Sequence, residues 1–372
     1  IYMIAQIKPS FTKNNTLKIS ISNDILNNNY KVCFSLVYSI KEIEGAVISN
    51  QIGRYYELEV LNELIFIKLQ TPKTGSYNLS CGPEGLFLID KDNKLVECSV
   101  DNLKFEHEIK RSNYSNDTID NFVPIIPEPQ KYSLNKDFVI NDKSFRVEDE
   151  ELIKNLDEIS RKLGVIFSKT EGMPIVLQKT NYTEDQYSII ISKENIEIYF
   201  NDYGGKFYAL MTLLQLIFFY DDKLPICKID DKPKFGWRGM HLDCARQYYT
   251  IKEIKRLLIY MSIFKLNRFH WHLTDNEAWR IEIKKYPNLT TQGSFRGYNQ
   301  KIPPFYGSGY NKYGGYYSQD EIRELISYAK KLNIEIMPEI DLPAHSWTLL
   351  QVMPELREET SNIISEDVGS YK

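Results

Sequence analysis

The 372-residue sequence has no long hydrophobic run, only five cysteines and no excess of charge of one sign. A helix that spans a bilayer needs about 20 mainly apolar residues. The longest candidate, residues 210–220, is shorter and contains Gln215. The net charge is -4, from 46 Lys and Arg against 50 Asp and Glu, and the two signs are interspersed. We therefore expect no membrane span, and no nucleic-acid or anionic-membrane partner.

The five cysteines show no spacing of the kind found in metal sites. Their odd number leaves at least one thiol unpaired within the chain, and we expect buried free thiols. A single bridge among the first three remains an alternative. The cysteines are Cys33, Cys81, Cys98, Cys227 and Cys244.

Residues 1–110 alternate apolar and polar side chains in short runs, such as residues 17–22 and 64–69, with turn signals between them. This pattern predicts an antiparallel β-sandwich module. Its role is open between a purely structural module and a carbohydrate-binding module, because no pattern of exposed aromatic residues singles out the second. Residues 111–121 are polar and are predicted to be a linker.

Residues 122–233 mix helical and strand patterns and are predicted to form a small α+β domain. Apolar spacing predicts an amphipathic helix at residues 148–163. Residues 187–191 and 196–200 are predicted to be paired strands. A nearly all-apolar helix at residues 207–219 is expected to be buried, packed against the next domain.

Residues 234–372 have the pattern of the first part of a TIM (β/α)8 barrel. Apolar segments end in charged or imidazole groups, and the helices between them begin with capping boxes at Thr250 and Ser318. Capped helices that each return to an apolar strand indicate a parallel sheet. A barrel needs about 250 residues, whereas about 137 remain from Gly236 onwards. We therefore expect an incomplete barrel, completed by further sequence of the same protein or, as the alternative, by another chain.

Ionisable residues follow the predicted strands, where the active sites of such barrels lie. Asp275 closes the second apolar segment, and Glu339, Asp341 and His345 follow the third. Three ionisable groups so close together at a strand end indicate a functional site. A lone Asp followed by Asn is also typical of a turn or helix cap, which is the structural alternative for Asp275.

Arg246 and a long connecting segment complete the candidate site. Arg246 follows the first apolar segment, after Asp243. Its structural alternative is an ion pair with Asp243. The connection at residues 276–317 is longer than usual, and its Gly and aromatic residues favour an ordered lid over the site.

His270 and His272 suggest a different chemistry. Side chains alternate along a strand, so both histidines are predicted to lie on one face, with Trp271 on the other. Such a pair at a barrel strand end can bind a divalent metal, which would make the protein a metal-dependent barrel hydrolase. The alternative is that both histidines are satisfied by contacts inside the barrel.

Several runs within residues 122–360 jointly resemble the family-20 glycoside hydrolases, the β-N-acetylhexosaminidases. The α+β segment before the barrel fits this family as well. The motifs are Trp237-Arg-Gly, Leu-Asp243, Arg246, His270-Trp-His-Leu-Thr-Asp275, Trp279-Arg280, Gly314-Gly-Tyr-Tyr and Pro338-Glu-Ile-Asp-Leu-Pro-Ala-His345.

The resemblance implies an exo-acting enzyme that removes terminal N-acetylglucosamine or N-acetylgalactosamine from glycans or chitooligosaccharides. Arg246 and Glu339 would bind the substrate, while Asp275, His345 and Asp341 would support the catalytic acid. Hydrolysis would be retaining and substrate-assisted, through an oxazolinium intermediate and without metal or cofactor. A periplasmic, secreted or lysosome-like compartment is also implied. The oligomeric state stays open, a homo-oligomer included.

The sequence departs from the family at its catalytic pair. In the family an Asp orients the acetamide and the next residue, Glu, protonates the leaving oxygen, within a His-x-Gly-Gly-Asp-Glu run that is absent here. Glu366-Asp367 has the wrong order and no glycines, so we expect the pair beyond Lys372. Asn276-Glu277 and Ala344 are milder departures from the usual Asp-Gln and Gly. A non-catalytic sugar-binding relative is therefore a second alternative.

Overall fold

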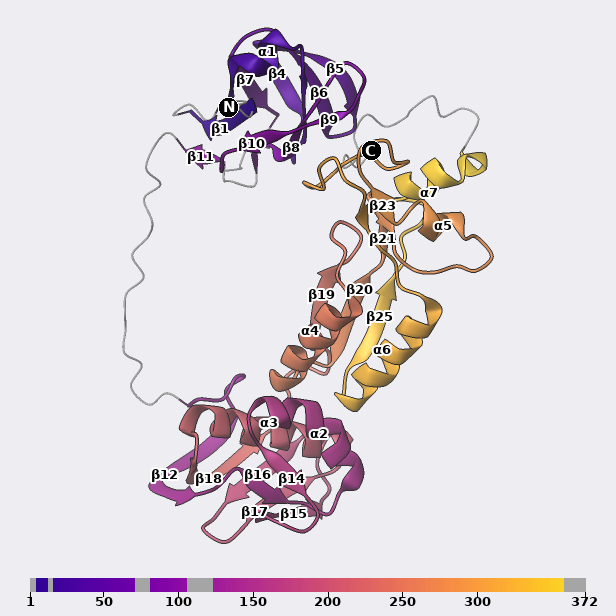
Figure 1. Ribbon diagram of the computed structural model, residues 1–372. Helices are drawn as coiled ribbons and strands as arrows, with labels where there is room; N and C mark the ends of the chain where they lie inside the picture. The colour runs from indigo at the N-terminus through magenta and orange to yellow at the C-terminus, as the bar shows by residue number, and fades with distance from the viewer. Residues whose placement is uncertain (1–4, 13–15, 71–80, 106–122, 358–372) are drawn as a thin grey trace.

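The computed structural model describes residues 5–12, 16–70, 81–105 and 123–357. Its strands form a pair of stacked sheets near the N-terminus, then a seven-stranded sheet, then a three-stranded parallel sheet, with two shorter two-stranded pairings (Figure 1). The predicted linker at residues 111–121 and the Glu366-Asp367 pair lie outside the described residues.

The N-terminal sheets enclose one apolar core. Alternation works as predicted in β2, where Leu17, Ile19 and Ile21 are buried and the residues between them are half-buried. The pairings are antiparallel except for β1, which pairs in parallel with β10 and β11, so the purely antiparallel prediction is wrong there. One sheet holds β1 (Ala5–Phe11), β2 (Leu17–Ile21), β4 (Ile40–Glu44), β7 (Leu64–Leu69), β10 (Cys98–Val100) and β11 (Lys104–Phe105). The other holds β3 (Lys31–Ser35), β5 (Ala46–Ile52), β6 (Tyr55–Val60), β8 (Glu84–Ile89) and β9 (Leu95–Val96), and α1 (Asn23–Asn27) follows β2.

The seven-stranded sheet is mixed and carries two helices. The predicted strand pair at residues 187–191 and 196–200 is confirmed as the antiparallel pair β16 and β17. The predicted helix at residues 148–163 is confirmed as α2 (Glu150–Lys162), with the Asp149 carboxylate accepting a hydrogen bond from the Leu152 amide. In order the sheet runs β12 (Lys131–Ile140), β18 (Lys223–Asp231), β16 (Tyr187–Ile191), β17 (Ile196–Phe200), β15 (Met173–Lys179), β13 (Ser144–Arg146) and β14 (Ile166–Ser168).

The apolar helix α3 (Tyr203–Tyr220) joins this sheet to the rest of the molecule. It packs on β16, β17 and β18 and also against α4 (Ile251–Ile263), which confirms the predicted burial against the next domain. Burial ends before the C-terminus of the helix, where Phe218 is 77% and Phe219 54% exposed. The prediction of complete burial is wrong for this last turn.

The third part alternates strands and helices. The strands β19 (Gly239–Asp243), β20 (Arg268–His272) and β25 (Glu335–Glu339) pair in parallel, as predicted. The helices α4 and α6 (Gln319–Lys331) both begin with the predicted capping boxes. Phe269 and Trp271 of the central strand are buried in a core shared with these helices. His270 and His272 lie on the opposite face, because both approach the carboxylate of Glu339.

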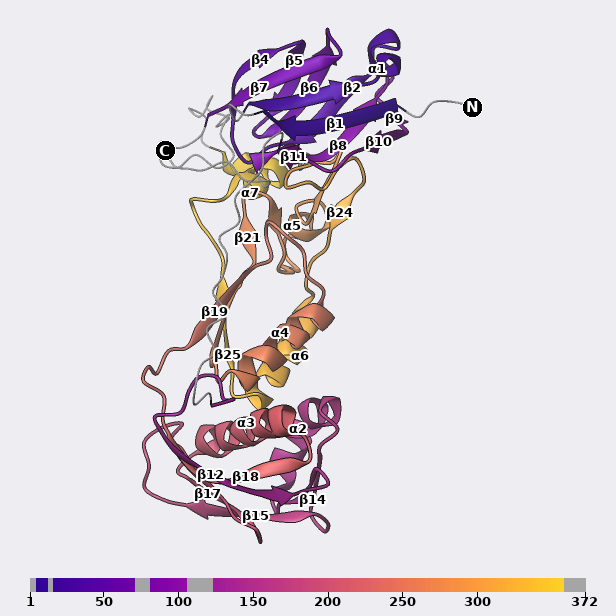
Figure 2. The same cartoon turned by 90° about the vertical axis from the view of Figure 1, so that its left-hand side faces the viewer.

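The long connection between β20 and α6 is ordered. Together with the segment after β25, it lies beyond the C-terminal ends of the parallel strands, on the side of the N-terminal sheets (Figure 2). Its elements, and those after β25, are β21 (Thr274–Asp275), β22 (Ala278–Trp279), α5 (Asn288–Thr291), β23 (Phe295–Arg296), β24 (Tyr313–Gly314), α7 (Trp347–Val352) and a short 3-10 helix (Pro354–Leu356).

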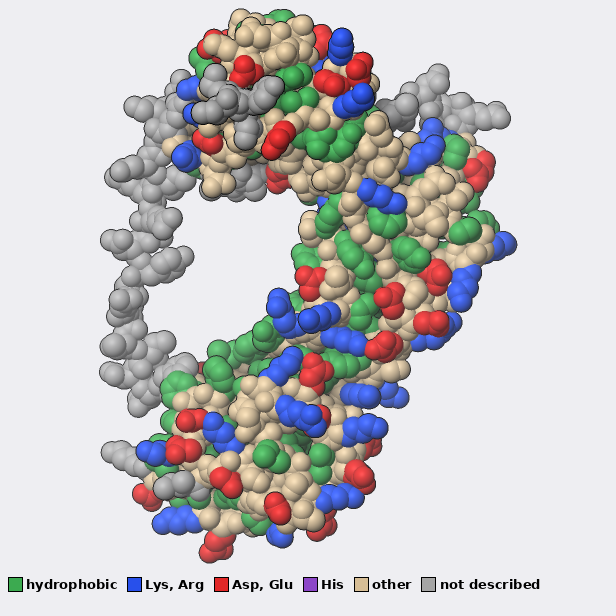
Figure 3. Space-filling model, in the orientation of Figure 1, with side chains coloured by type: hydrophobic (Ala, Val, Ile, Leu, Met, Phe, Trp, Pro, Cys, Tyr) green, Lys and Arg blue, Asp and Glu red, His purple; other side chains and the backbone are tan. Residues whose placement is uncertain are grey.

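None of the five cysteines is in a disulfide, so no bridge forms among the first three, and four of the thiols are buried. Among the described residues, no helix is both long and apolar enough to cross a membrane. Figure 3 shows hydrophobic side chains on the surface of the middle section, between the N-terminal sheets and the seven-stranded sheet. On the strands of this section, Met240 is 42% and Met337 37% exposed.

Candidate active site

Strand register brings three candidate groups into one row. Asp243 is the register partner of His272, and His272 is that of Glu339. These are the last residues of β19, β20 and β25. Their side chains therefore meet at the C-terminal edge of the parallel sheet, where barrel enzymes place their chemistry.

Arg246 is held by three carboxylates. Its Nη1 lies 2.9 Å from Oδ2 of Asp243 and 2.8 Å from Oδ2 of Asp275. Its Nε lies 2.9 Å from Oε2 of Glu277. The predicted structural alternative, a pair with Asp243, is therefore one part of a larger cluster. The Arg246 side chain remains 26% exposed and can reach a ligand.

His272 is a buried cation at the centre of the row. Its Nδ1 is 3.4 Å from Asp243 Oδ1, and its Nε2 is 3.2 Å from Asp275 Oδ2 and 3.5 Å from Asp341 Oδ2. Burial lowers the pKa of His272, but hydrogen bonds to Asp243 and Asp275 and the charge of Glu339 outweigh burial and raise the pKa to about 10. His272 therefore carries its proton at neutral pH.

Asp275 and His345 form a direct pair. Asp275 Oδ1 lies 3.0 Å from His345 Nδ1, and the Asp275 carboxylate is 1% exposed. Burial raises the pKa of Asp275, but contacts with His272, the Asn276 amide, Arg246 and His345 together lower it. Asp275 is thus an anion at neutral pH, oriented between cationic and imidazole groups. This position differs from an exposed turn or cap.

Glu277 is a buried carboxyl beside Arg246. Burial raises the pKa of Glu277 to about 7, although the charge of Arg246 opposes this shift. The side chain is 4% exposed. Glu277 therefore changes charge near neutral pH.

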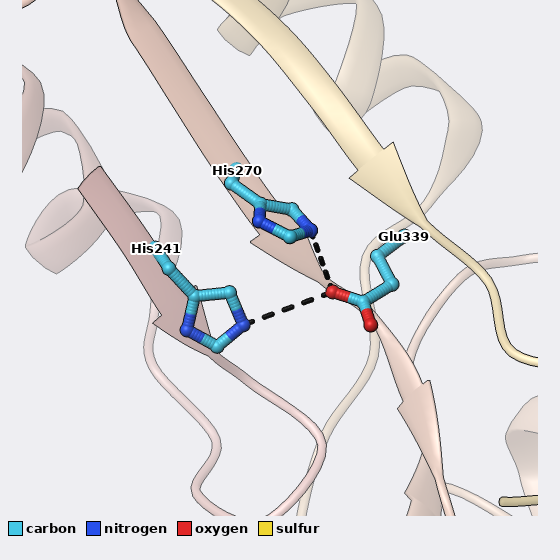
Figure 4. A group of neighbouring side chains, drawn as sticks. All are labelled: His241, His270 and Glu339. Atoms are coloured by element: carbon cyan, nitrogen blue, oxygen red, sulfur yellow. Dashed lines mark ion pairs between the residues drawn. The ribbon is translucent and has the colours of Figure 1, made fainter. Parts of the chain in front are cut away.

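Glu339 reaches toward two further histidines. Its Oε2 lies 2.6 Å from Nε2 of His270 and 3.7 Å from Nε2 of His241 (Figure 4). Their ligand atoms are close enough together to hold a metal ion. His272, the predicted partner of His270 in a metal site, instead forms a second such group with Glu339 and Asp341, whose ligand atoms are also close enough together to hold a metal ion.

Sequence reasoning missed His272 as a charged member of the site, and it missed Glu277 and Arg296 as well. Arg296 is 1% exposed, and its Nη1 donates a hydrogen bond of 2.6 Å to the carbonyl oxygen of Arg246. An ionisable residue so deeply buried signals function or structure only once burial is known. The departure from Asp-Gln at positions 276 and 277 was the one sequence signal for Glu277.

Known proteins match this part of the chain. The family model described as glycosyl hydrolase family 20, catalytic domain, matches residues 235–371. A β-hexosaminidase of Vibrio furnissii is 42% identical over 188 residues, which is 50% of this chain and 31% of that protein. An N,N'-diacetylchitobiase of Vibrio harveyi is 38% identical over 168 residues, 43% of this chain and 19% of that protein. The chain spans less than a third of the length of either relative.

Solved structures match a larger part of this chain than the two relatives found by sequence. A GH20 exo-β-N-acetylglucosaminidase from Vibrio harveyi, in complex with N-acetylglucosamine, aligns with a TM-score of 0.81 at 25% identity, over 96% of this chain and 60% of that one. A β-N-acetylhexosaminidase from Bacteroides fragilis aligns with a TM-score of 0.53 at 31% identity, over 63% of this chain and 48% of that one. Residues 235–371, which contain the whole cluster described above, are similar to the catalytic domain of glycoside hydrolase family 20.

Proposed function

We propose that the protein is an exo-acting β-N-acetylhexosaminidase. Its substrates are glycans or chitooligosaccharides that end in N-acetylglucosamine or N-acetylgalactosamine. The observation that carries this proposal is the charged cluster around Arg246, beside the Asp275–His345 pair, within the segment that matches the family-20 catalytic domain. A nucleic-acid partner or a cofactor is not part of the proposal.

Arg246 and Glu339 bind the terminal sugar in this proposal. Asp243, Asp275 and Glu277 hold the guanidinium in one orientation, so little conformational entropy is lost when a sugar hydroxyl accepts its hydrogen bonds. Glu339 lies in the same row and is 29% exposed. Charged groups fixed in advance are the usual means of orienting a polar ligand.

Asp275, His345 and Asp341 support the catalytic acid. Asp275 fixes one ring nitrogen of His345, so the other can orient the glutamic acid that protonates the leaving oxygen. Asp341 belongs to the same cluster, because one side-chain oxygen or nitrogen atom of each of Asp341, Asp275 and His345 lies within 4.8 Å of the others. A general acid must hold its proton until the transition state, and neighbouring charges set that affinity.

The reaction is substrate-assisted and retaining. The acetamide oxygen of the substrate attacks the anomeric carbon, the bond to the leaving oxygen breaks, and the acid gives that oxygen its proton. Water then opens the oxazolinium intermediate. The three parallel strands are the first strands of a (β/α)8 barrel in this proposal. An Asp-Glu pair, for which these 372 residues contain no matching run, supplies the acid and orients the acetamide.

The proposal is tested with the full-length protein and aryl glycosides. Hydrolysis of an aryl β-N-acetylglucosaminide is expected, with little hydrolysis of the aryl β-glucoside, which lacks the acetamide nucleophile. Replacing the N-acetyl group by N-trifluoroacetyl makes its oxygen a poorer nucleophile, so kcat/KM should fall steeply. Equal rates on the glucoside would contradict the substrate-assisted mechanism.

The same assay separates the alternatives. Activity should survive chelation, because the acetamide and carboxyl groups perform the chemistry. Stoichiometric zinc with loss of activity on chelation would favour a metal-dependent hydrolase. Binding of N-acetylglucosamine without turnover would favour a non-catalytic sugar-binding relative.

A further inference from the structure

The segment between β23 and β24, residues 297–312, connects the N-terminal sheets to the candidate active site, and we call it the bridging loop. Figure 2 shows β24 close beneath these sheets. Phe87 of β8 packs edge-on against two tyrosines of the loop. The ring centroids are 5.9 Å from Tyr298 and 5.6 Å from Tyr310.

Side chains from the N-terminal sheets and the bridging loop form one small buried core. Because removing apolar groups from water favours the contact, this core holds the loop against the sheets. Its members are all between 0% and 4% exposed. They are Cys33, Tyr55, Phe87 and Ile89 from the sheets, with Ile302 and Phe305 from the loop.

The two backbones also touch directly. The Gly307 amide donates a hydrogen bond of 3.1 Å to Oγ of Ser35. Gly85 faces Gly307 so closely that a Cβ at Gly85 would lie 2.8 Å from the Gly307 carbonyl carbon. A side chain at Gly85 would therefore push the loop away from the sheet.

The residue next to this contact, Tyr306, lies beside a buried arginine next to the site. Its ring lies 5.9 Å from the guanidinium of Arg296, which itself bonds to the Arg246 carbonyl. Partial burial raises the pKa of Tyr306 to about 12; the charge of Glu277 adds to the shift and Arg246 opposes it. The tyrosine is therefore neutral near pH 7 and can donate a hydrogen bond. It is 48% exposed, so a ligand can touch it.

We propose that Tyr306 lines the site around the terminal sugar. We also propose that the N-terminal sheets hold Tyr306 in position through the bridging loop. This inference rests on the proposed function, in which Arg246 binds hydroxyls of the non-reducing terminal sugar. Tyr306 lies beside Arg296, which donates to the Arg246 carbonyl oxygen, so in this inference it contacts the sugar that Arg246 binds. The N-terminal sheets thus contribute to substrate affinity without touching the substrate.

The test compares steady-state kinetics of full-length variants on an aryl β-N-acetylglucosaminide. Tyr306→Ala should raise KM about tenfold and change kcat little, because the contact is present in both ground and transition states. Tyr306→Phe should raise KM about threefold, in line with the loss of one neutral hydrogen bond. Gly85→Ala, which displaces the loop, should raise KM toward the value of Tyr306→Ala.

Gly164→Ala is the matched control. Gly164 has a φ of +68° and Gly85 a φ of +62°, so alanine brings similar backbone strain at both. A Cβ at Gly164 would meet nothing within 4 Å, so its KM should stay at the wild-type value. If Gly85→Ala does not fold, Ser35→Ala is the milder variant, because it adds no atoms at the contact and removes the hydrogen bond from the Gly307 amide, together with a long one of 3.4 Å to the Glu84 carbonyl oxygen.

A double variant distinguishes positioning from a general loss of structure. If the sheets act through Tyr306, Gly85→Ala combined with Tyr306→Ala should have the KM of Tyr306→Ala alone. Additive effects, or a wild-type KM for Gly85→Ala and Ser35→Ala, would overturn the inference. An inactive wild-type protein would instead count against the proposed function itself, so the two failures are distinguishable.

Discussion

At the scale of single residues, the site is a cluster in which carboxylates outnumber the cationic side chains. Arg246 is in contact with three carboxylates, and His272 approaches four. Charges removed from water are stable only when paired and well oriented, and removing one partner costs more than the pair contributes. Single substitutions here should therefore have large effects.

Arg246→Lys should greatly reduce activity. Lysine keeps the charge but cannot contact Asp275 and Glu277 with separate, fixed nitrogens while also binding a sugar hydroxyl. We expect a loss of about 2–4 kcal/mol in kcat/KM. Arg268→Lys is the control, because Arg268 pairs at 3.3 Å with a Glu335 side chain that is 63% exposed. Near wild-type kinetics for Arg246→Lys would assign Arg246 a structural role only.

Asp275→Asn should mainly affect the chemical step. The change removes the charge that orients His345 and stabilises protonated His272. We expect a loss in kcat of about 100-fold or more, together with a smaller rise in KM, because Asp275 also holds Arg246 in place. A substrate with a very good leaving group needs less protonation and should lose less. Equal losses for good and poor leaving groups, with an unshifted pH–rate profile, would exclude Asp275 from the relay.

Glu277 should make stability depend on pH. Its pKa is raised from 4.5 to about 7, chiefly by burial, so the folded state binds more protons than the unfolded state between these values. The stability of the wild type relative to Glu277→Gln should therefore fall as pH rises from 4.5 to 7, by up to about 1.4 kcal/mol per pH unit, and then level off. Thermal unfolding at several pH values measures this difference. The exposed Glu355→Gln control should keep the wild-type profile, and a Glu277→Gln difference independent of pH would refute the argument.

At the scale of elements, caps and register place the site. The capping boxes of α4 and α6 fix where each helix begins, and each helix returns the chain to the next parallel strand. Register then decides which residues end side by side. A slip of one residue in β20 would move His270 and His272 to the face covered by helices.

Ser318→Ala tests the contribution of a cap. It removes the hydrogen bond from the Glu321 amide to the Ser318 hydroxyl, and the unfolding free energy should fall by about 1 kcal/mol. Ser327→Ala on the exposed face of the same helix should cost little, because alanine favours helix. Kinetic constants should stay unchanged for both. Equal stability of the two variants would contradict the role of the cap.

At the scale of the whole molecule, the seven-stranded sheet and the parallel sheet share one continuous apolar core. Ionic contacts reinforce the junction: Arg238 reaches Asp185 at 2.8 Å, and the buried Lys265 reaches Asp231 at 3.1 Å. The N-terminal sheets have a separate main core and meet the third part through the bridging loop. From these two kinds of junction we predict that the seven-stranded sheet and the parallel sheet form one rigid unit. The N-terminal sheets are predicted to fold separately.

A protein made of these 372 residues alone should not hydrolyse an aryl N-acetylglucosaminide. The sequence contains no His-x-Gly-Gly-Asp-Glu run to supply the acid. Within the described residues β19 and β25 each pair on one side only, and unpaired strand edges promote association. Size-exclusion chromatography should therefore show self-association. Turnover by a pure, monodisperse sample would show that the acid is provided within these residues.

The sequence by itself determined what depends on neighbours a few residues away. Alternation placed His270 and His272 on one face, and the spacing of Thr250 with Glu253 located a helix start. Motifs such as the run from Pro338 to His345 indicated the resemblance to family 20, which the match of residues 235–371 supports. These signals are readable because strand periodicity and capping involve only local geometry.

Only the tertiary structure decided which distant groups meet and how deeply they are buried. Glu277 beside Arg246, the proton on His272 and the place of Tyr306 depend on register and on exclusion of water, which no local pattern specifies. The hydrogen bond from Gly307 to Ser35 joins residues 272 positions apart. Such contacts form because burial of an apolar core brings the two segments together, and the charges at the site take their pKa values from that burial.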